Sequence, residues 1–262
     1  MPKAYEEIAD DLRRAIRGGE LTPGARLPSE AELARRHGRS VPTIQNALRL
    51  LSAEGLIDKR HGSGTFVRRP RTRAVRDNER HQWEKDRALM PESARAETGA
   101  TERETGLVID DLVFFARYRQ LAAPTDLAEA FGVSNGTVLL ERTYRTRHAA
   151  ETAPFSLVTS YLVRDMVAAN PDLLDETNEP WPGGTQNQLR TVGIEVDRVE
   201  ERFTARPPTP EEARELDLPA GTSVILLRKR SYDIHDRIVD ITAVTLPGDR
   251  TELLFTTHLE RW

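Results

Sequence analysis

Four polar side chains between residues 43 and 49 are of the types that read DNA bases. The amides of Gln45 and Asn46 can form paired hydrogen bonds with adenine, and the Arg49 guanidinium can do the same with guanine. On a helix these three residues lie on one side together with Pro42, and Thr43 lies on the flank. The spacing therefore predicts a polar helix face that could enter the major groove of DNA.

An apolar stripe on the opposite side of the same helix would hold this face outward. The stripe recurs at helical spacing and consists of Ile44, Ala47, Leu48 and Leu51. Ser40 is a favourable N-cap residue, and Pro42 in the first turn costs no hydrogen bond. Gly55 marks the end of the helix.

A shorter helix is predicted just before this one. Ser29 and Glu32 have the spacing of a capping box, in which each side chain bonds the backbone of the other residue. Leu33 and Ala34 supply the buried side, and Gly38 suits a left-handed helix end. Two short helices joined by a tight turn predict a helix-turn-helix, and residues 4–18 add an amphipathic helix before it.

A basic hairpin follows the helices. Residues 56–60 and 65–67 suit two strands around a glycine-rich tip, where the backbone could approach a groove closely. Together these signals predict a winged helix-turn-helix over residues 1–68; the alternative is a small helical domain with a solvated polar face. The candidate DNA contacts are Arg26, Ser29, Thr43, Gln45, Asn46, Arg49, His61, Gly62, Ser63 and Gly64.

Charge divides the chain in the same way. Residues 1–76 hold 16 of the 38 lysines and arginines and 9 of the 42 acidic residues, so this part carries +7 and the remainder −11. Because only the N-terminal part carries a positive net charge, we expect only this part to attract the phosphates of DNA. Residues 69–105 are charged and begin with a proline-interrupted basic run, so we expect a linker and connecting arm there.

Several classes of protein are excluded or disfavoured. The chain has no cysteine, and no apolar run approaches the roughly 20 residues that span a bilayer, so we expect a cytoplasmic protein without membrane association. Its six histidines show no metal-ligand spacing, and neither a Walker motif nor a G-x-S-x-G elbow is present. We therefore expect no metal, no cofactor and no catalytic residues.

Residues 106–262 repeat one pattern. A capped helix and a turn at 124–137 lead into an apolar strand at 138–140, and the same order recurs at 208–222 and 223–227. Further strands are expected at 154–163 and 238–247. A duplicated unit of this kind can build one antiparallel sheet with helices packed on it, and a cleft in such a domain is the default ligand site.

The N-terminal module resembles the GntR family of bacterial transcription regulators. The matching segments are Pro23-Gly24, Leu27-Pro28-Ser29-Glu30, Leu33-Ala34, Thr43-Ile44, Ala47-Leu48, Glu54-Gly55-Leu56-Ile57 and Gly62-Ser63-Gly64-Thr65-Phe66-Val67. The family often has arginine where this chain has Ala31, Val41 and Gln45, and those arginines commonly contact guanines or phosphates. We therefore expect an operator that differs from the usual one of the family.

The C-terminal domain resembles the effector-binding UTRA domain of the HutC subfamily. The matching segments are 138–142, 159–162, 183–185, 206–213, 239–240 and 246–250. The resemblance implies an α+β protein in which a winged helix-turn-helix precedes a chorismate-lyase-like antiparallel sheet with packed helices. It also implies a small-molecule sensor.

The resemblance also suggests effector contacts. Arg142 stands where the subfamily often has an anion-binding arginine, and Tyr144 where a second arginine is frequent. Ser156 and Asp240 stand where acidic ligand contacts are common, and a helix at 185–191 could hold an anion at its start. The alternatives are a surface salt bridge for Arg142, edge-strand solubility for Ser156 and Asp240, and core packing for Tyr144. The candidate effector contacts are Arg142, Tyr144, Ser156, Ser160, Gly184, Thr185 and Asp240.

These observations lead to one hypothesis about function. We expect a bacterial repressor that binds a palindromic double-stranded operator as a homodimer and is released by a small polar metabolite. The alternatives are a constitutive DNA-binding protein without a ligand response and an enzyme of chorismate-lyase-like fold.

Overall fold

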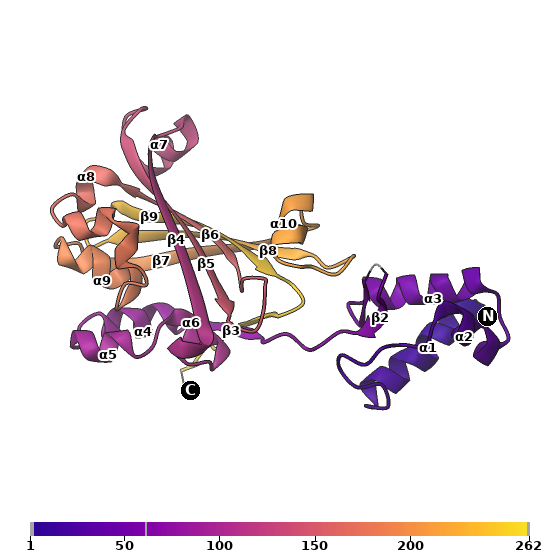
Figure 1. Ribbon diagram of the computed structural model, residues 1–262. Helices are drawn as coiled ribbons and strands as arrows, with labels where there is room; N and C mark the ends of the chain where they lie inside the picture. Colours follow the sequence, from indigo (N-terminus) through magenta and orange to yellow (C-terminus); the bar gives the residue numbers. More distant parts are fainter. Residues whose placement is uncertain (1–2, 61, 261–262) are drawn as a thin grey trace. The chain divides into compact units, whose positions relative to one another are not determined.

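The computed structural model describes residues 3–60 and 62–260, and their contacts form two compact units. The first unit contains residues 1–71 together with 207–223, and the second contains residues 72–206 and 224–262. Figure 1 shows the helices and strands of both units.

The first unit is a winged helix-turn-helix. Its main elements are α1 (Ala4–Arg17), α2 (Glu30–His37), α3 (Val41–Ala53), β1 (Ile57–Arg60) and β2 (Gly64–Val67). The two strands pair antiparallel, with Ile57 opposite Val67 and Arg60 opposite Gly64. The helix α10 (Pro210–Glu215) belongs to the additional segment of this unit.

Local signals determine where these helices begin and end. The predicted capping box joins Ser29 and Glu32, and Gly38 ends α2 in the left-handed conformation. Ser40 precedes α3 but makes no capping hydrogen bond, and its hydroxyl lies 2.9 Å from the Thr43 hydroxyl.

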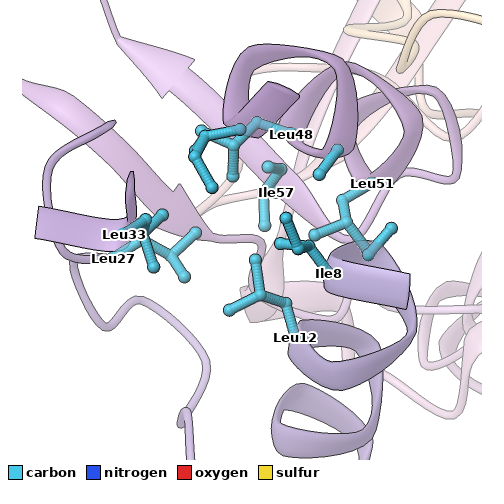
Figure 2. Packing of buried hydrophobic residues seen from close by; sticks show 10 residues of the cluster. Ile8, Leu12, Leu27, Leu33, Leu48, Leu51 and Ile57 are labelled. Carbon is cyan, nitrogen blue, oxygen red and sulfur yellow. The ribbon is translucent and has the colours of Figure 1, made fainter. Parts of the chain in front are cut away.

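A single apolar core lies between the helices and the wing. The predicted stripe of α3 is buried there against Ile8 and Leu12 of α1, Leu33 of α2 and Ile57 of β1 (Figure 2). The side chains of Leu33, Ile44 and Leu51 are fully buried. Burial of this stripe turns the polar side of α3 outward.

The second unit is built on one antiparallel sheet. Its strand order is β4-β5-β6-β9-β8-β7, so two consecutive three-strand meanders meet between β6 and β9. These strands are β4 (Leu112–Ala122), β5 (Val138–His148), β6 (Leu157–Val163), β7 (Val196–Arg206), β8 (Val224–Asp233) and β9 (Ile238–Pro247). The sequence predicted four of these six strands; it did not predict β4 and β7, which form the two edges.

Short helices accompany the sheet. They are α4 (Arg80–Arg87), α5 (Glu92–Ala96), α6 (Ala100–Thr105), α7 (Thr125–Phe131), α8 (Arg164–Val167) and α9 (Gly184–Thr191). α4 and α9 are neighbours at one end of the sheet (Figure 1). Three one-turn 3₁₀ helices, Ile109–Asp111, Pro171–Leu174 and Glu176–Asn178, complete the connections.

The segment expected to be a linker and connecting arm is part of this unit from residue 72 onward. Its first strand, β3 (Ala74–Asp77), pairs in parallel with β10 (Thr251–Leu254) near the end of the chain. This pairing and the helices α4–α6 place residues 74–105 against the sheet. Residues 74–105 are called the arm.

Candidate functional site

The outward side of α3 carries two side chains suited to base contacts. Arg49 is exposed and Asn46 is half-buried. Within residues 3–60 and 62–260, neither side chain has a hydrogen-bond or ion-pair partner. Both are therefore free to bond a base edge without losing an internal contact.

Gln45 differs from these two residues because it is already bonded. Its amide donates to Glu30 at 2.7 Å, and Lys59 of the wing donates to the other oxygen of the same carboxylate at 3.0 Å. These two hydrogen bonds hold the pKa of Glu30 below its ordinary value. Gln45 thus links α3, α2 and β1.

The two hydroxyl groups predicted to contact phosphates also have partners. Ser29 Oγ lies 2.7 Å from Glu32 Oε2 and accepts from the Glu32 amide, and Thr43 Oγ1 lies 2.9 Å from Ser40 Oγ. Hydroxyl groups can make more than one hydrogen bond, so these contacts do not prevent a phosphate contact.

The tip of the wing is exposed at Gly62 and Ser63. Gly64 has a φ of 118°, and a Cβ there would lie 2.8 Å from Arg26 Nε, so glycine gives the Arg26 side chain the room that it occupies. The guanidinium of Arg26 therefore lies beside the tip of the wing, and Arg26 is exposed. His61, which was also predicted to contact DNA, lies outside the described residues.

The second unit contains a cavity of about 350 Å³ between the sheet and the arm. Five of the predicted effector contacts line it: Tyr144, Ser156, Ser160, Gly184 and Thr185. The other two, Arg142 and Asp240, are absent from its wall and fully buried. Ser156 lies just before β6 and is not paired with Asp240. The residue opposite Asp240 in the sheet is Ser231 of β8.

Arg142 is held by an internal network beneath the cavity. Its guanidinium donates to Gln188 of α9 at 2.7 Å and to Ser160 of β6 at 2.8 Å, and lies 3.5 Å from Asp240. Arg142 therefore lies neither at the surface nor in the cavity wall of this structure. Arg142 supports Ser160 and Gln188, which themselves line the cavity.

Asp240 is the counter-charge of this network. It accepts from Ser160 at 2.7 Å and from Thr242 at 2.8 Å, and Lys229 Nζ lies 3.2 Å away. Burial by itself would favour the neutral acid, but Lys229, Arg142 and the two hydroxyl donors lower the pKa of Asp240 below its ordinary value. The carboxylate therefore stays ionised and orients the donors around it.

Tyr144 belongs to a second polar cluster, centred on Glu179. The hydroxyl groups of Tyr144 and Tyr118 both donate to Glu179 Oε1, which also accepts from Gln188 at 2.9 Å. Burial raises the pKa of Tyr144 well above its ordinary value, so its hydroxyl remains a donor. One side of the cavity wall thus consists of bonded polar groups.

The start of α9 forms another part of the wall. Gly183 and Gly184 have φ values of 100° and 62°, and the helix begins at Gly184, close to the predicted position. Gly183, Gly184 and Thr185 all line the cavity. Backbone N–H groups at such a helix start favour negative or polar groups of a ligand.

Sequence reasoning missed the part of the wall that the arm contributes. Arg76, Arg80, His81 and Glu84 line the cavity, and Arg76 and His81 each lie close to Glu201 of β7, at 3.2 and 3.0 Å. Arg80 pairs with Glu84 at 3.1 Å and with Glu104. The signal that could have identified them is the density of opposite charges within residues 76–104, which suits buried pairs as well as a solvated linker.

Lys229 and Thr242 were missed for a different reason. Thr242 lies on a predicted strand, whereas Lys229 lies two residues beyond the predicted end of its strand at residue 227. The pairing that places the two residues opposite each other is a long-range property. Leu227 and Lys229 are two residues apart, as are Thr242 and Val244. This spacing is the local signal that the members of each pair share one face of the sheet.

Comparison with known proteins identifies both units. The model of the gntR family of bacterial regulatory proteins matches residues 4–67, and the model of the UTRA domain matches residues 115–252. The chain belongs to the GntR family and carries a UTRA domain. The predicted resemblance and the α+β fold are therefore confirmed, and the chain is a transcription regulator of this type.

Curated relatives align over nearly the whole chain. The transcriptional repressor NagR of Bacillus subtilis is 26% identical over 94% of this chain and 91% of its own length. The histidine utilization repressor of Pseudomonas putida is 26% identical over 95% and 90%. Both are repressors and neither is an enzyme, in agreement with the sequence-based expectation.

Solved structures also align over nearly the whole chain. A GntR-family transcriptional regulator aligns with a TM-score of 0.60 and 25% identity over 98% of both chains. PhnF from Mycobacterium smegmatis aligns with a TM-score of 0.53 and 22% identity over 97% of this chain and 100% of its own, which supports the fold alone. Among residues 3–60 and 62–260, no helix is long and apolar enough to cross a membrane.

Proposed function

We propose that this chain is a ligand-responsive repressor that acts in the cytoplasm. It binds a near-palindromic operator as a homodimer, and a small metabolite in the UTRA cavity lowers its affinity for that operator. The observation that carries the proposal is the presence, in one chain, of a helix face with the free side chains of Asn46 and Arg49 and of a cavity of about 350 Å³ in the second unit.

The homodimer follows from the size of a DNA-binding module. One winged helix contacts one half-site, whereas two modules related by a two-fold axis double both the contacts and the specificity. The chain has one such module, so a palindromic operator requires two chains. In light scattering we expect twice the 29.5 kDa of one chain for the free protein, and the mass of two chains plus one duplex for the complex with operator DNA.

The DNA contacts divide into two kinds. Asn46 and Arg49 bond base edges, with Gln45 in a lesser role, while Arg26, Ser29, Thr43 and the wing tip hold the phosphate backbone. Selection from a random duplex pool should return a consensus with two inverted half-sites. The double variant Asn46→Ala/Arg49→Ala should lose that consensus, while Arg14→Ala, which removes an exposed charge from α1, should keep it.

The ligand response requires different affinities of the ligand for the DNA-binding and released states. A shift from 1:99 to 99:1 needs a ratio of about 10⁴, and operator DNA must weaken ligand binding by the same factor that ligand weakens DNA binding. Fluorescence anisotropy of the full chain on its operator, titrated with candidate ligands, tests this. If ligands bind the cavity and leave operator affinity unchanged, the protein is a constitutive DNA-binding protein and the proposal is wrong.

A further inference from the structure

The sheet face beneath the cavity is arranged in rows across the strands. Ser160 of β6 lies opposite Arg142 of β5 on one side and Thr242 of β9 on the other, and Thr242 lies opposite Lys229 of β8. Every residue in this row is polar, and Ser160, Thr242 and Lys229 line the cavity.

The next row, two residues further along each strand, is apolar on three of its four strands. Val158 lies opposite Tyr144 on β5 and Val244 on β9, and Val244 lies opposite Leu227 on β8. Residues two apart on a strand share a face and lie about 7 Å apart. All four residues line the same cavity as the polar row.

The apolar surface continues beyond this row. Phe114 of β4, Leu246 of β9 and Phe155, which lies just before β6, also line the cavity. Phe155 and Leu246 are buried. The cavity therefore has an apolar half, formed by aromatic and branched side chains. Its other half is formed by the polar row, Glu179 and the start of α9.

The charges around the cavity balance one another. Lys229 is paired with Asp240, and the arginines at the start of the arm are paired with glutamates. The cations of the described wall are Arg76, Arg80, Arg87, Arg95 and Lys229, and its carboxylates are Glu84, Glu102, Glu104 and Glu179. Directly behind the wall lie one further cation, Arg142, and two further carboxylates, Asp240 and Glu201. Counted together, these six cations and six carboxylates cancel, so apart from His81 when protonated they carry no net positive charge that would favour a dianionic phosphate.

From this division of the wall we infer that the effector is amphipathic. Its aromatic or branched aliphatic body lies over the Val158–Val244–Leu227 row. Its single hydrogen-bonding head, which is neutral or singly charged, lies at the Ser160–Thr242–Lys229 row. The inference rests on the proposed function and narrows its ligand. It replaces the small polar metabolite expected from sequence, because a wholly hydrophilic molecule would leave the apolar half without contacts.

The first experiment compares probes that differ in body and head. Calorimetry on the full chain uses phenylbutyrate, octanoate and the amide of each as apolar-bodied probes, and a hexose monophosphate and inorganic phosphate as hydrophilic ones. We expect an apolar-bodied probe to bind at least about tenfold more tightly than either phosphate compound.

The second experiment changes the apolar row without changing its size. Val158→Thr and Val244→Thr replace a methyl group by a hydroxyl group at the cavity wall, and Val113→Thr makes the same change on β4 at a site that is 38% exposed and outside the cavity. Each cavity variant should weaken binding of the apolar-bodied probe about tenfold, and the Val113 variant should leave it unchanged. Thermal unfolding of all three variants checks that each is folded.

The outcomes separate this inference from the proposed function. Binding of a hexose monophosphate in preference to all apolar-bodied probes, or no binding of any apolar-bodied probe at millimolar concentration, overturns the inference. Equal effects of the cavity and Val113 variants overturn it as well. If an apolar-bodied probe binds as expected but operator affinity is unaffected at saturation, the ligand class stands and the proposed release mechanism fails.

Discussion

The amide of Gln45 donates a hydrogen bond to the Glu30 carboxylate at 2.7 Å, so a residue of the recognition helix is held by the helix that precedes it. Lys59 holds the same carboxylate from the wing. A base contact by Gln45 would have to replace this bond, whereas Asn46 and Arg49 have no such bond to lose. In the protein without DNA, Gln45 therefore differs from Asn46 and Arg49 in already having a side-chain hydrogen bond.

This inequality predicts an order among three alanine variants. Asn46→Ala and Arg49→Ala should each weaken operator binding by about 1–3 kcal/mol, because each removes a free base-reading group. Gln45→Ala should cost less than either, and should instead lower the stability of the first unit. Anisotropy titrations at one salt concentration check the order, which is contradicted if Gln45→Ala gives the largest loss.

Arg26 should act on all DNA sequences alike. Its guanidinium lies beside the wing tip at Gly64, a position suited to a phosphate. Arg26→Ala should weaken operator and random duplex by the same factor and reduce the slope of log K against log salt by about 1. Arg14→Ala, which removes a charge that is 79% exposed on α1, serves as the control. A loss confined to the operator would assign Arg26 to base contacts instead.

The Arg142–Ser160–Asp240 network predicts a large effect on stability. Arg142→Ala leaves Asp240 ionised and fully buried with one fewer cation, so the second unit should lose about 3–5 kcal/mol. Arg117→Ala, on the exposed face of β4, should be neutral by comparison. Urea unfolding measures both variants. If Arg142→Ala kept full stability and lost only ligand binding, the residue would be a direct ligand contact, as the sequence first suggested.

His81 predicts a pH dependence of stability. Burial opposes its protonation, but the neighbouring carboxylates of Glu201 and Glu84 outweigh both that effect and the nearby Lys229, so the pKa of His81 is raised above 6.5. A group whose pKa is raised on folding stabilises the folded state fully below its unfolded pKa. That stabilisation is lost as the pH rises through the folded pKa.

The variant His81→Gln tests this sign. It should destabilise the second unit by about 1–3 kcal/mol near pH 5, and the difference from the parent should shrink as the pH rises above the folded pKa. The same change at His235, an exposed residue, serves as the control variant. Thermal unfolding across this pH range is the measurement, and a difference that grew with pH would contradict the assigned sign.

The local sequence by itself determined most of the DNA-binding unit. The Ser29–Glu32 capping box, the left-handed Gly38 and the apolar stripe of α3 are all found where the sequence placed them. Each depends on residues within about four positions of one another, because capping and helical periodicity are local. The outward direction of Asn46 and Arg49 follows from the same periodicity.

Only the tertiary structure determined whether each charged residue of the second unit is solvated, paired or placed at the cavity wall. The pairing of Ala74 with Thr251 converts a segment that resembles a linker into the arm of the cavity wall. The pairing of Ser160 with Arg142 and Thr242 places Arg142 under the cavity rather than in it. These outcomes depend on which distant strands pair and in which register, and a strand's own residues carry only an alternation of two faces. Whether a charge on such a face is solvated, paired or ligand-binding is therefore settled only when the partner strands are in place.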